Sequence, residues 1–125
     1  MLLHKKRQTI VKKLDRLQTE REQVLSLFLR EDSLVAGTYA NVLVRCGKPN
    51  CYCHEEGGHP ATRLSRWVEG KLKTKIVRVA DREWVKRASE QYKAHKAALK
   101  HLRKLHKKEL EMLKEILEVK TIDYG

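Results

Sequence analysis

The glycines and prolines are concentrated in the middle of the chain, and this distribution constrains the fold more than any other feature. Residues 33–80 contain five of the six glycines and both prolines of the 125-residue sequence. The stretches 1–32 and 81–120 contain neither. Because Gly and Pro interrupt helices, the flanks can form long helices, whereas the centre must turn repeatedly. We therefore expect an α+β protein with a small central sheet between two long helices.

Four segments follow from this pattern. Residues 1–32 are predicted to form an amphipathic helix, 33–80 a β-module, 81–120 a long basic amphipathic helix and 121–125 a tail. Asp81 is the expected N-cap of the second helix. The two helices are expected to pack as an antiparallel, coiled-coil-like hairpin, with dimerisation added because two helices alone bury little surface. Pairing of each helix with a second protomer is the alternative.

The two helices carry apolar stripes on which this prediction depends. The stripe of the first helix contains Leu3, Ile10, Leu14, Leu17, Val24 and Phe28, and that of the second contains Trp84, Ala88, Tyr92, Leu99, Leu102, Leu105, Met112, Leu113 and Ile116. Their spacing follows helical periodicity, so each stripe lies along one side of its helix. His95 and His106 fall on the same side of the second helix and are expected to be core histidines with satisfied hydrogen bonds.

The centre is predicted to be a three-stranded antiparallel sheet. Residues 37–45 read as one strand, and residues 62–79 as a hairpin that turns at Glu69 and Gly70. A two-residue loop fixes the register, so Val68 faces Lys71 and the pairing continues from there. One face would carry Trp67, Leu72, Thr74 and Ile76 and is expected to be the core. The other would carry Arg66, Lys71, Lys73 and Lys75, together with Leu64 and Val68.

All three cysteines lie between residues 46 and 53, inside the glycine-rich centre. Zinc takes four tetrahedral ligands from thiolate and imidazole, and a Cys₃His set is one of its structural choices. We therefore predict a structural zinc ion held by Cys46, Cys51, Cys53 and His59, which would stabilise a sheet too small for a large core. His54 competes with His59 for the fourth position. The alternative is that the cysteines are reduced and have no shared role. A catalytic thiol is not indicated, because the sequence has neither a C-x-x-C motif nor an evident His or Asn partner.

"RCGKPNCYC", "GGHP" and "LSRWVEGKLKTKIV" together resemble an uncharacterised prokaryotic domain-of-unknown-function family. Its members share an RCGK-x-x-C-x-C…G-x-H-x-P-like core, and many are encoded beside transposases or on other mobile elements. The resemblance covers about residues 33–108. It implicates the following positions: Cys46, Gly47, Lys48, Cys51, Cys53, His59, Trp67 and Gly70. It implies a mobile-element context and no established activity.

The charge is strongly positive, with 28 Lys and Arg against 16 Asp and Glu, which gives a net charge of +12. This balance indicates either a polyanionic partner or a well-solvated surface. No apolar run exceeds three residues, whereas a membrane span needs about 20. The sequence therefore favours a cytoplasmic protein with no membrane partner.

The favoured function is non-catalytic nucleic-acid binding, and DNA is favoured over RNA. In this hypothesis the cationic face of the two-stranded hairpin lies in the major groove. The expected contacts are Arg45, Lys48, Arg63, Arg66, Lys71, Lys73, Lys75, Lys86, Lys93 and Lys100. Stacking of bases on aromatic side chains has less support, because Trp67 and Trp84 are expected to be needed for packing. The alternative is a helical interaction or homodimerisation module with a zinc-bound tip, which would dock a partner such as a transposase. No motif indicates an enzyme.

Overall fold

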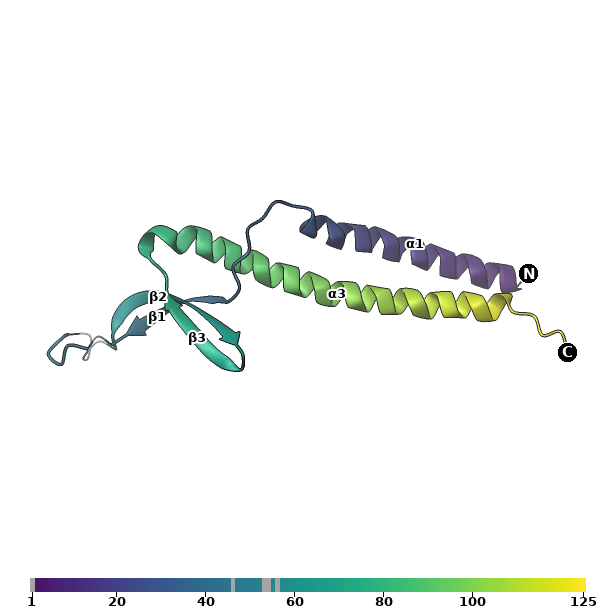
Figure 1. The fold of residues 1–125 in the computed structure, drawn as a ribbon. Helices are drawn as coiled ribbons and strands as arrows, with labels where there is room; N and C mark the ends of the chain where they lie inside the picture. The colour runs from purple at the N-terminus through teal and green to yellow at the C-terminus, as the bar shows by residue number, and fades with distance from the viewer. Residues whose placement is uncertain (1, 46, 53–54, 56) are drawn as a thin grey trace. The chain divides into compact units, whose positions relative to one another are not determined.

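The computed structural model describes residues 2–45, 47–52, 55 and 57–125, with side chains from residue 5 onward. Its elements follow one another as α1 (Leu2–Phe28), β1 (Thr38–Val44), β2 (His59–Val68), β3 (Lys71–Ile76), a 3₁₀ turn η1 (Val79–Asp81) and α3 (Arg82–Lys120) (Figure 1). The expected α+β class is confirmed: two long helices accompany a three-stranded antiparallel sheet. None of the described helices is both long enough and apolar enough to cross a lipid bilayer.

The chain forms two compact units. One contains Met1–Glu31 and His95–Gly125, and the other contains Asp32–Ala94. We call them the helical unit and the sheet unit. The helix α3 supplies residues to both, so the sheet unit takes in the first turns of α3 as well as the strands.

In the helical unit, α1 lies beside α3 and runs in the opposite direction (Figure 1). His101 Nε2 of α3 lies 2.8 Å from Glu20 Oε1 of α1, and the Phe28 and His95 rings meet edge to face with centroids 5.0 Å apart. The buried apolar side chains of this unit come from both helices: Ile10, Leu17, Ala98 and Leu105. Burial of these side chains is what holds the pair together.

The seam along α3 differs in detail from the predicted stripe. Apart from His101, its less exposed residues in the helical unit alternate in steps of three and four: His95, Ala98, Leu102, Leu105, Glu109, Met112, Ile116 and Val119. Leu99 and Leu113, which were expected on the stripe, are each 46% exposed, and His106 is exposed too. A projection at 100° per residue assumes 3.6 residues per turn, whereas alternating steps of three and four residues correspond to 3.5. Over a helix as long as α3 the two patterns diverge, so the projection wrongly placed Leu99, Leu113 and His106 on the buried side.

In the sheet unit, β2 is the central strand and β1 and β3 are the edges. The predicted hairpin register is confirmed: Val68 pairs with Lys71, Trp67 with Leu72 and so on to Leu64 with Lys75. Glu69 and Gly70 have φ values of 50° and 79°. Positive φ at both central residues is the signature of a type I′ turn, whose twist matches that of the paired strands.

The connector from α1 to β1 is attached to the first turns of α3. The Val35 amide donates to the Ala88 carbonyl at 3.2 Å, and Ser89 Oγ donates to the Gly37 carbonyl at 2.9 Å. Ser89 is 2% exposed. Because a buried hydroxyl without a partner is costly, this hydrogen bond fixes where β1 begins against α3.

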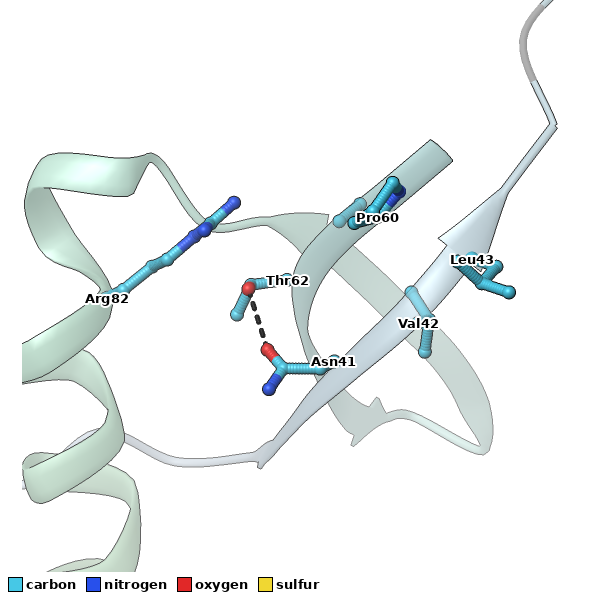
Figure 2. Close-up of a pocket in the computed structure, with 7 residues that line it drawn as sticks. Asn41, Val42, Leu43, Pro60, Thr62 and Arg82 are labelled. Atoms are coloured by element: carbon cyan, nitrogen blue, oxygen red, sulfur yellow. Dashed lines mark hydrogen bonds between the residues drawn. The ribbon is translucent and has the colours of Figure 1, made fainter. Parts of the chain in front are cut away.

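The face of the hairpin expected to be the core is instead exposed. Trp67 is 73% exposed, Leu72 53% and Ile76 59%, and Thr74 is exposed as well. The helix α3 approaches the opposite side of the sheet, where Thr62 is buried and Arg82 lies beside it (Figure 2). Both faces of the hairpin carry apolar residues, so alternation alone could not show which face the helix covers.

Candidate metal centre and cationic sheet surface

The loop between β1 and β2 brings His59 to the end of β1. Gly58 has a φ of 125°, and a Cβ atom on it would lie 2.9 Å from the backbone N and C of Val44. Only glycine combines that conformation with so close an approach. The chain can therefore re-enter the sheet at His59, directly opposite Val44.

Cys51 and His59 are in contact although eight residues separate them. Cys51 Sγ lies 3.1 Å from His59 Nε2, and Tyr52 Oη lies 3.2 Å from His59 Nδ1. The Tyr52 and His59 rings meet edge to face, with centroids 5.0 Å apart. A turn in which the Cys51 amide donates to the Lys48 carbonyl at 3.3 Å aims the cysteine toward the strand. Two predicted zinc ligands are thus brought together.

The Cys51–His59 contact is compatible with two ligands of one zinc ion. Tetrahedral zinc with Zn–S near 2.3 Å and Zn–N near 2.0 Å separates sulfur from nitrogen by about 3.5 Å, so ligation would need Cys51 Sγ and His59 Nε2 to move apart by about 0.4 Å from their 3.1 Å separation. When the ring N–H at Nδ1 of His59 donates to Tyr52 Oη, Nε2 keeps a lone pair that faces Cys51. Metal-binding histidines are commonly oriented by such a partner on the second ring nitrogen.

The other proposed ligands lie outside the described residues: Cys46, Cys53 and the competing His54. Within the described ranges, no group of three or more His, Cys, Asp or Glu side chains is placed to hold a metal ion. The ligand set therefore stays a prediction, and the described chain contributes its Cys51–His59 pair.

The same pair has a second chemical reading. A thiol beside an imidazole that a third group orients is the arrangement of an activated nucleophile. The sequence offered no evident histidine partner for a reactive cysteine, and the structure supplies one in His59. The sequence analysis brought these two residues together only as zinc ligands and did not consider His59 as a partner of a reactive thiol. Zinc ligation accounts for the neighbouring Cys46 and Cys53 as well, which a lone nucleophile does not.

The cationic face predicted for the hairpin is present. Arg66 lies directly opposite Lys73, and Lys71 and Lys75 continue the same face of β3. Arg66, Lys73 and Lys75 line a pocket of about 630 Å³ together with residues 34–36. In the part of the chain that the structure describes, these side chains have no acidic partner. The connector that forms the other wall was not predicted, since nothing in its sequence indicates that it folds back beside the hairpin.

The remaining predicted nucleic-acid contacts are dispersed. All of them are exposed: Arg45, Lys48, Arg63, Lys86, Lys93 and Lys100. Arg63 projects from the other side of the sheet, and Lys100 belongs to the helical unit. Of the ten predicted contacts, the structure places Arg66, Lys71, Lys73 and Lys75 on one face of the hairpin.

A second pocket, of about 420 Å³, lies between β1, β2 and the first residue of α3 (Figure 2). Thr62 Oγ1 donates to Asn41 Oδ1 at 2.9 Å there, and Thr62 is 2% exposed. Arg82 Nε is buried and, among the described atoms, has no hydrogen-bond acceptor. Sequence reasoning did not single out Arg82, whose only signal is its position after the expected N-cap Asp81.

A family model matches most of this architecture. The model of a domain of unknown function, DUF6788, matches residues 2–87, which is more than half of the chain. The chain belongs to this family. The DUF6788 match takes in α1, the sheet and the first residues of α3, so it begins earlier and ends sooner than the expected range of 33–108. No curated protein and no solved structure matches the chain.

Proposed function

We propose that this DUF6788 protein is a non-catalytic nucleic-acid-binding protein whose main contact surface is the cationic face of the β2–β3 hairpin. The observation that carries the proposal is the cross-strand pair of Arg66 and Lys73, with Lys71 and Lys75 beside it on β3. Like charges placed directly opposite on adjacent strands are destabilising. A polyanion that neutralises them removes this repulsion on binding.

Nucleic-acid phosphates fit this surface better than a single small anion does. The four cations extend along the hairpin, and the chain as a whole carries a net charge of +12. Lysine and arginine contacts to phosphates release counterions and give salt-sensitive affinity. DNA is proposed ahead of RNA because the family resemblance implies genes beside transposases, whose substrate is DNA.

Zinc is proposed as a structural cofactor, held by Cys46, Cys51, Cys53 and His59. The contact between Cys51 and His59 and the orienting Tyr52 support this assignment. When bound, the ion would close the loop between β1 and β2 and fix the sheet that presents the cations. Zinc sites with four protein ligands leave no position for a reactive water, which agrees with a role outside catalysis.

The test is a salt titration of binding to duplex and single-stranded DNA. The triple variant R66E/K73E/K75E should lose about 10-fold or more in affinity, and its slope of log Kobs against log salt should become shallower by about 2 to 3. The control, K5E/K12E/K13E, changes the net charge equally on exposed residues of α1. Equal losses in both variants would show that only overall charge matters, and unchanged binding in the hairpin variant would refute the proposed surface.

A second candidate function is a helical dimerisation or partner-docking module. The helices carry exposed apolar side chains outside their shared seam: Val11 and Leu25 on α1, and Leu99, Leu110, Leu113 and Leu117 on α3. A coiled-coil contact with a second copy, or with a partner such as a transposase, would cover them. Sedimentation over a range of concentrations separates the candidates: an obligate dimer indifferent to DNA favours this one, and a DNA-binding monomer favours the first.

A further inference from the structure

The hairpin has a second surface that faces away from its cationic side. Three cross-strand pairs form it: Trp67 with Leu72, Ser65 with Thr74, and Arg63 with Ile76. Ser65 Oγ and Thr74 Oγ1 lie 3.2 Å apart and hold the middle pair together. We call this surface the open face. Its largest member, Trp67, is 73% exposed.

An exposed tryptophan paired with an exposed leucine, Leu72, is a surface that a partner would cover. The charges around it indicate the kind of partner. From residue 59 to residue 76 the chain carries five cations against one acid, Glu69. Arg63 lies on the open face, and the other four cations lie on the opposite side of the same hairpin: Arg66, Lys71, Lys73 and Lys75. The occupant should therefore combine negative charge with flat apolar groups.

Single-stranded nucleic acid has both properties. Its bases present π faces that stack on aromatic side chains, and its phosphates follow basic residues beside them. In a duplex, the base faces are covered by their neighbours in the stack, so Trp67 would find no partner there. All six residues of β3 are exposed along this edge strand, and its lysines are long enough to extend their ammonium groups around the edge toward a strand on the open face.

We propose that the open face is a stacking platform for single-stranded nucleic acid, with Trp67 stacked on a base and Arg63 on the adjoining backbone. This inference rests on the proposed nucleic-acid binding and narrows it to unpaired strands. A second copy of the chain fits the face less well, because a twofold contact would bring two Arg63 side chains and two lysine-rich edges together. Such like-charge contacts oppose association.

The test uses the full chain carrying W84F, which leaves Trp67 as the only tryptophan. Binding to an oligothymidine of about 20 nucleotides should quench Trp67 fluorescence, whereas a duplex of equal length should not. In the otherwise unchanged protein, W67A should weaken binding to the single strand by about 10- to 100-fold and W67F by much less, since phenylalanine still stacks. Neither should change duplex binding more than about twofold, because duplex contacts are made to phosphates.

The W84F variant alone is the matched control, since Trp84 is also exposed but lies on α3; it should bind both ligands as the unchanged protein does. Circular dichroism checks that W67A remains folded. If it does not, the quenching of Trp67 by the single strand and not by the duplex, measured in the W84F chain, gives the answer. Unchanged single-strand affinity in W67A, with losses in the charge-reversal variant, would overturn the platform and leave the proposed function standing. No binding to any nucleic acid would overturn both, and dimerisation that W67A abolishes would assign the open face to a second copy.

Discussion

Glu69 is the one described residue other than glycine that has a positive φ, 50°. It occupies the first central position of the type I′ turn, where Asn or Gly is preferred. The left-handed conformation costs an ordinary residue about 1 kcal/mol. We therefore expect E69N to raise the free energy of unfolding by about 1 kcal/mol, measured by urea denaturation.

The control for this prediction is E69Q, which removes the same charge but keeps a residue unsuited to positive φ. Both variants should bind DNA slightly more tightly, because each removes the only acid of the hairpin. Only E69N should gain stability. Equal stabilisation by both would mean that charge, and not backbone conformation, limits the turn.

Tyr52 offers a test of the zinc assignment at a residue that is not itself a ligand. Its hydroxyl lies 3.2 Å from His59 Nδ1. Loss of such an orienting partner typically weakens metal affinity by 10- to 100-fold, so Y52F should weaken zinc binding by about 10-fold. C51A and H59A should lower the bound zinc well below one equivalent, measured by atomic absorption after preparation without chelators.

H106A is the control for the zinc measurements, because His106 is an exposed histidine on α3. It should leave the zinc content unchanged. A metal-free unmodified protein in which Cys51 reacts rapidly with iodoacetamide would contradict the zinc centre and favour the nucleophile reading.

Residues differ in how much of their role the sequence reveals. Gly70 was predicted in its turn because a two-residue loop between alternating strands needs positive φ there. The exposure of Trp67 was not predicted, because aromatic residues in strands usually pack. Which side of a sheet is covered depends on the path of α3 and of the connector, and residues far from Trp67 determine that path.

At the scale of elements, the pairing of α1 with α3 depends on a narrow seam. Leu105 is 3% exposed, whereas Leu110, five residues later on the same helix, is 53% exposed. L105A should therefore lower the free energy of unfolding by about 2–4 kcal/mol, and L110A by about 0.5 kcal/mol or less. Comparable losses of unfolding free energy in L105A and L110A would show that the outer leucines are also buried, as they would be in a dimer. Sedimentation of both variants would then show whether a dimer forms.

The elements themselves were largely predictable. The absence of Gly and Pro from residues 1–32 and 81–120 predicted both helices, and the two-residue loop predicted the register of the β2–β3 pair. The exact seam of α3 was not: His95 was expected on it, but Glu109, whose charge removes it from any apolar pattern, was not. Their places follow from the 3–4 repeat of the neighbouring residues and from the His95 contact with Phe28.

At the scale of the whole molecule, the two compact units were not evident from the sequence. The predicted segments ended the β-module at residue 80, whereas the sheet unit continues to Ala94. The link is made by Ser89 and by the backbone of Val35 and Ala88. Hydrogen bonds between backbone groups leave almost no trace in sequence, so this division could be found only in the structure.

The two units should respond differently to metal removal. The sheet unit buries few apolar side chains, among them Val77, Val85 and Ala88, so a zinc ion would supply much of its folding free energy. The helical unit depends on its own seam and contains none of the proposed ligands. With a strong chelator present, amide exchange should therefore accelerate in β1 and β2, while the amides around Leu105 stay protected. The zinc-bound protein provides the reference, and acceleration confined to the loop would show that the sheet is stable without metal and that the ion acts only locally.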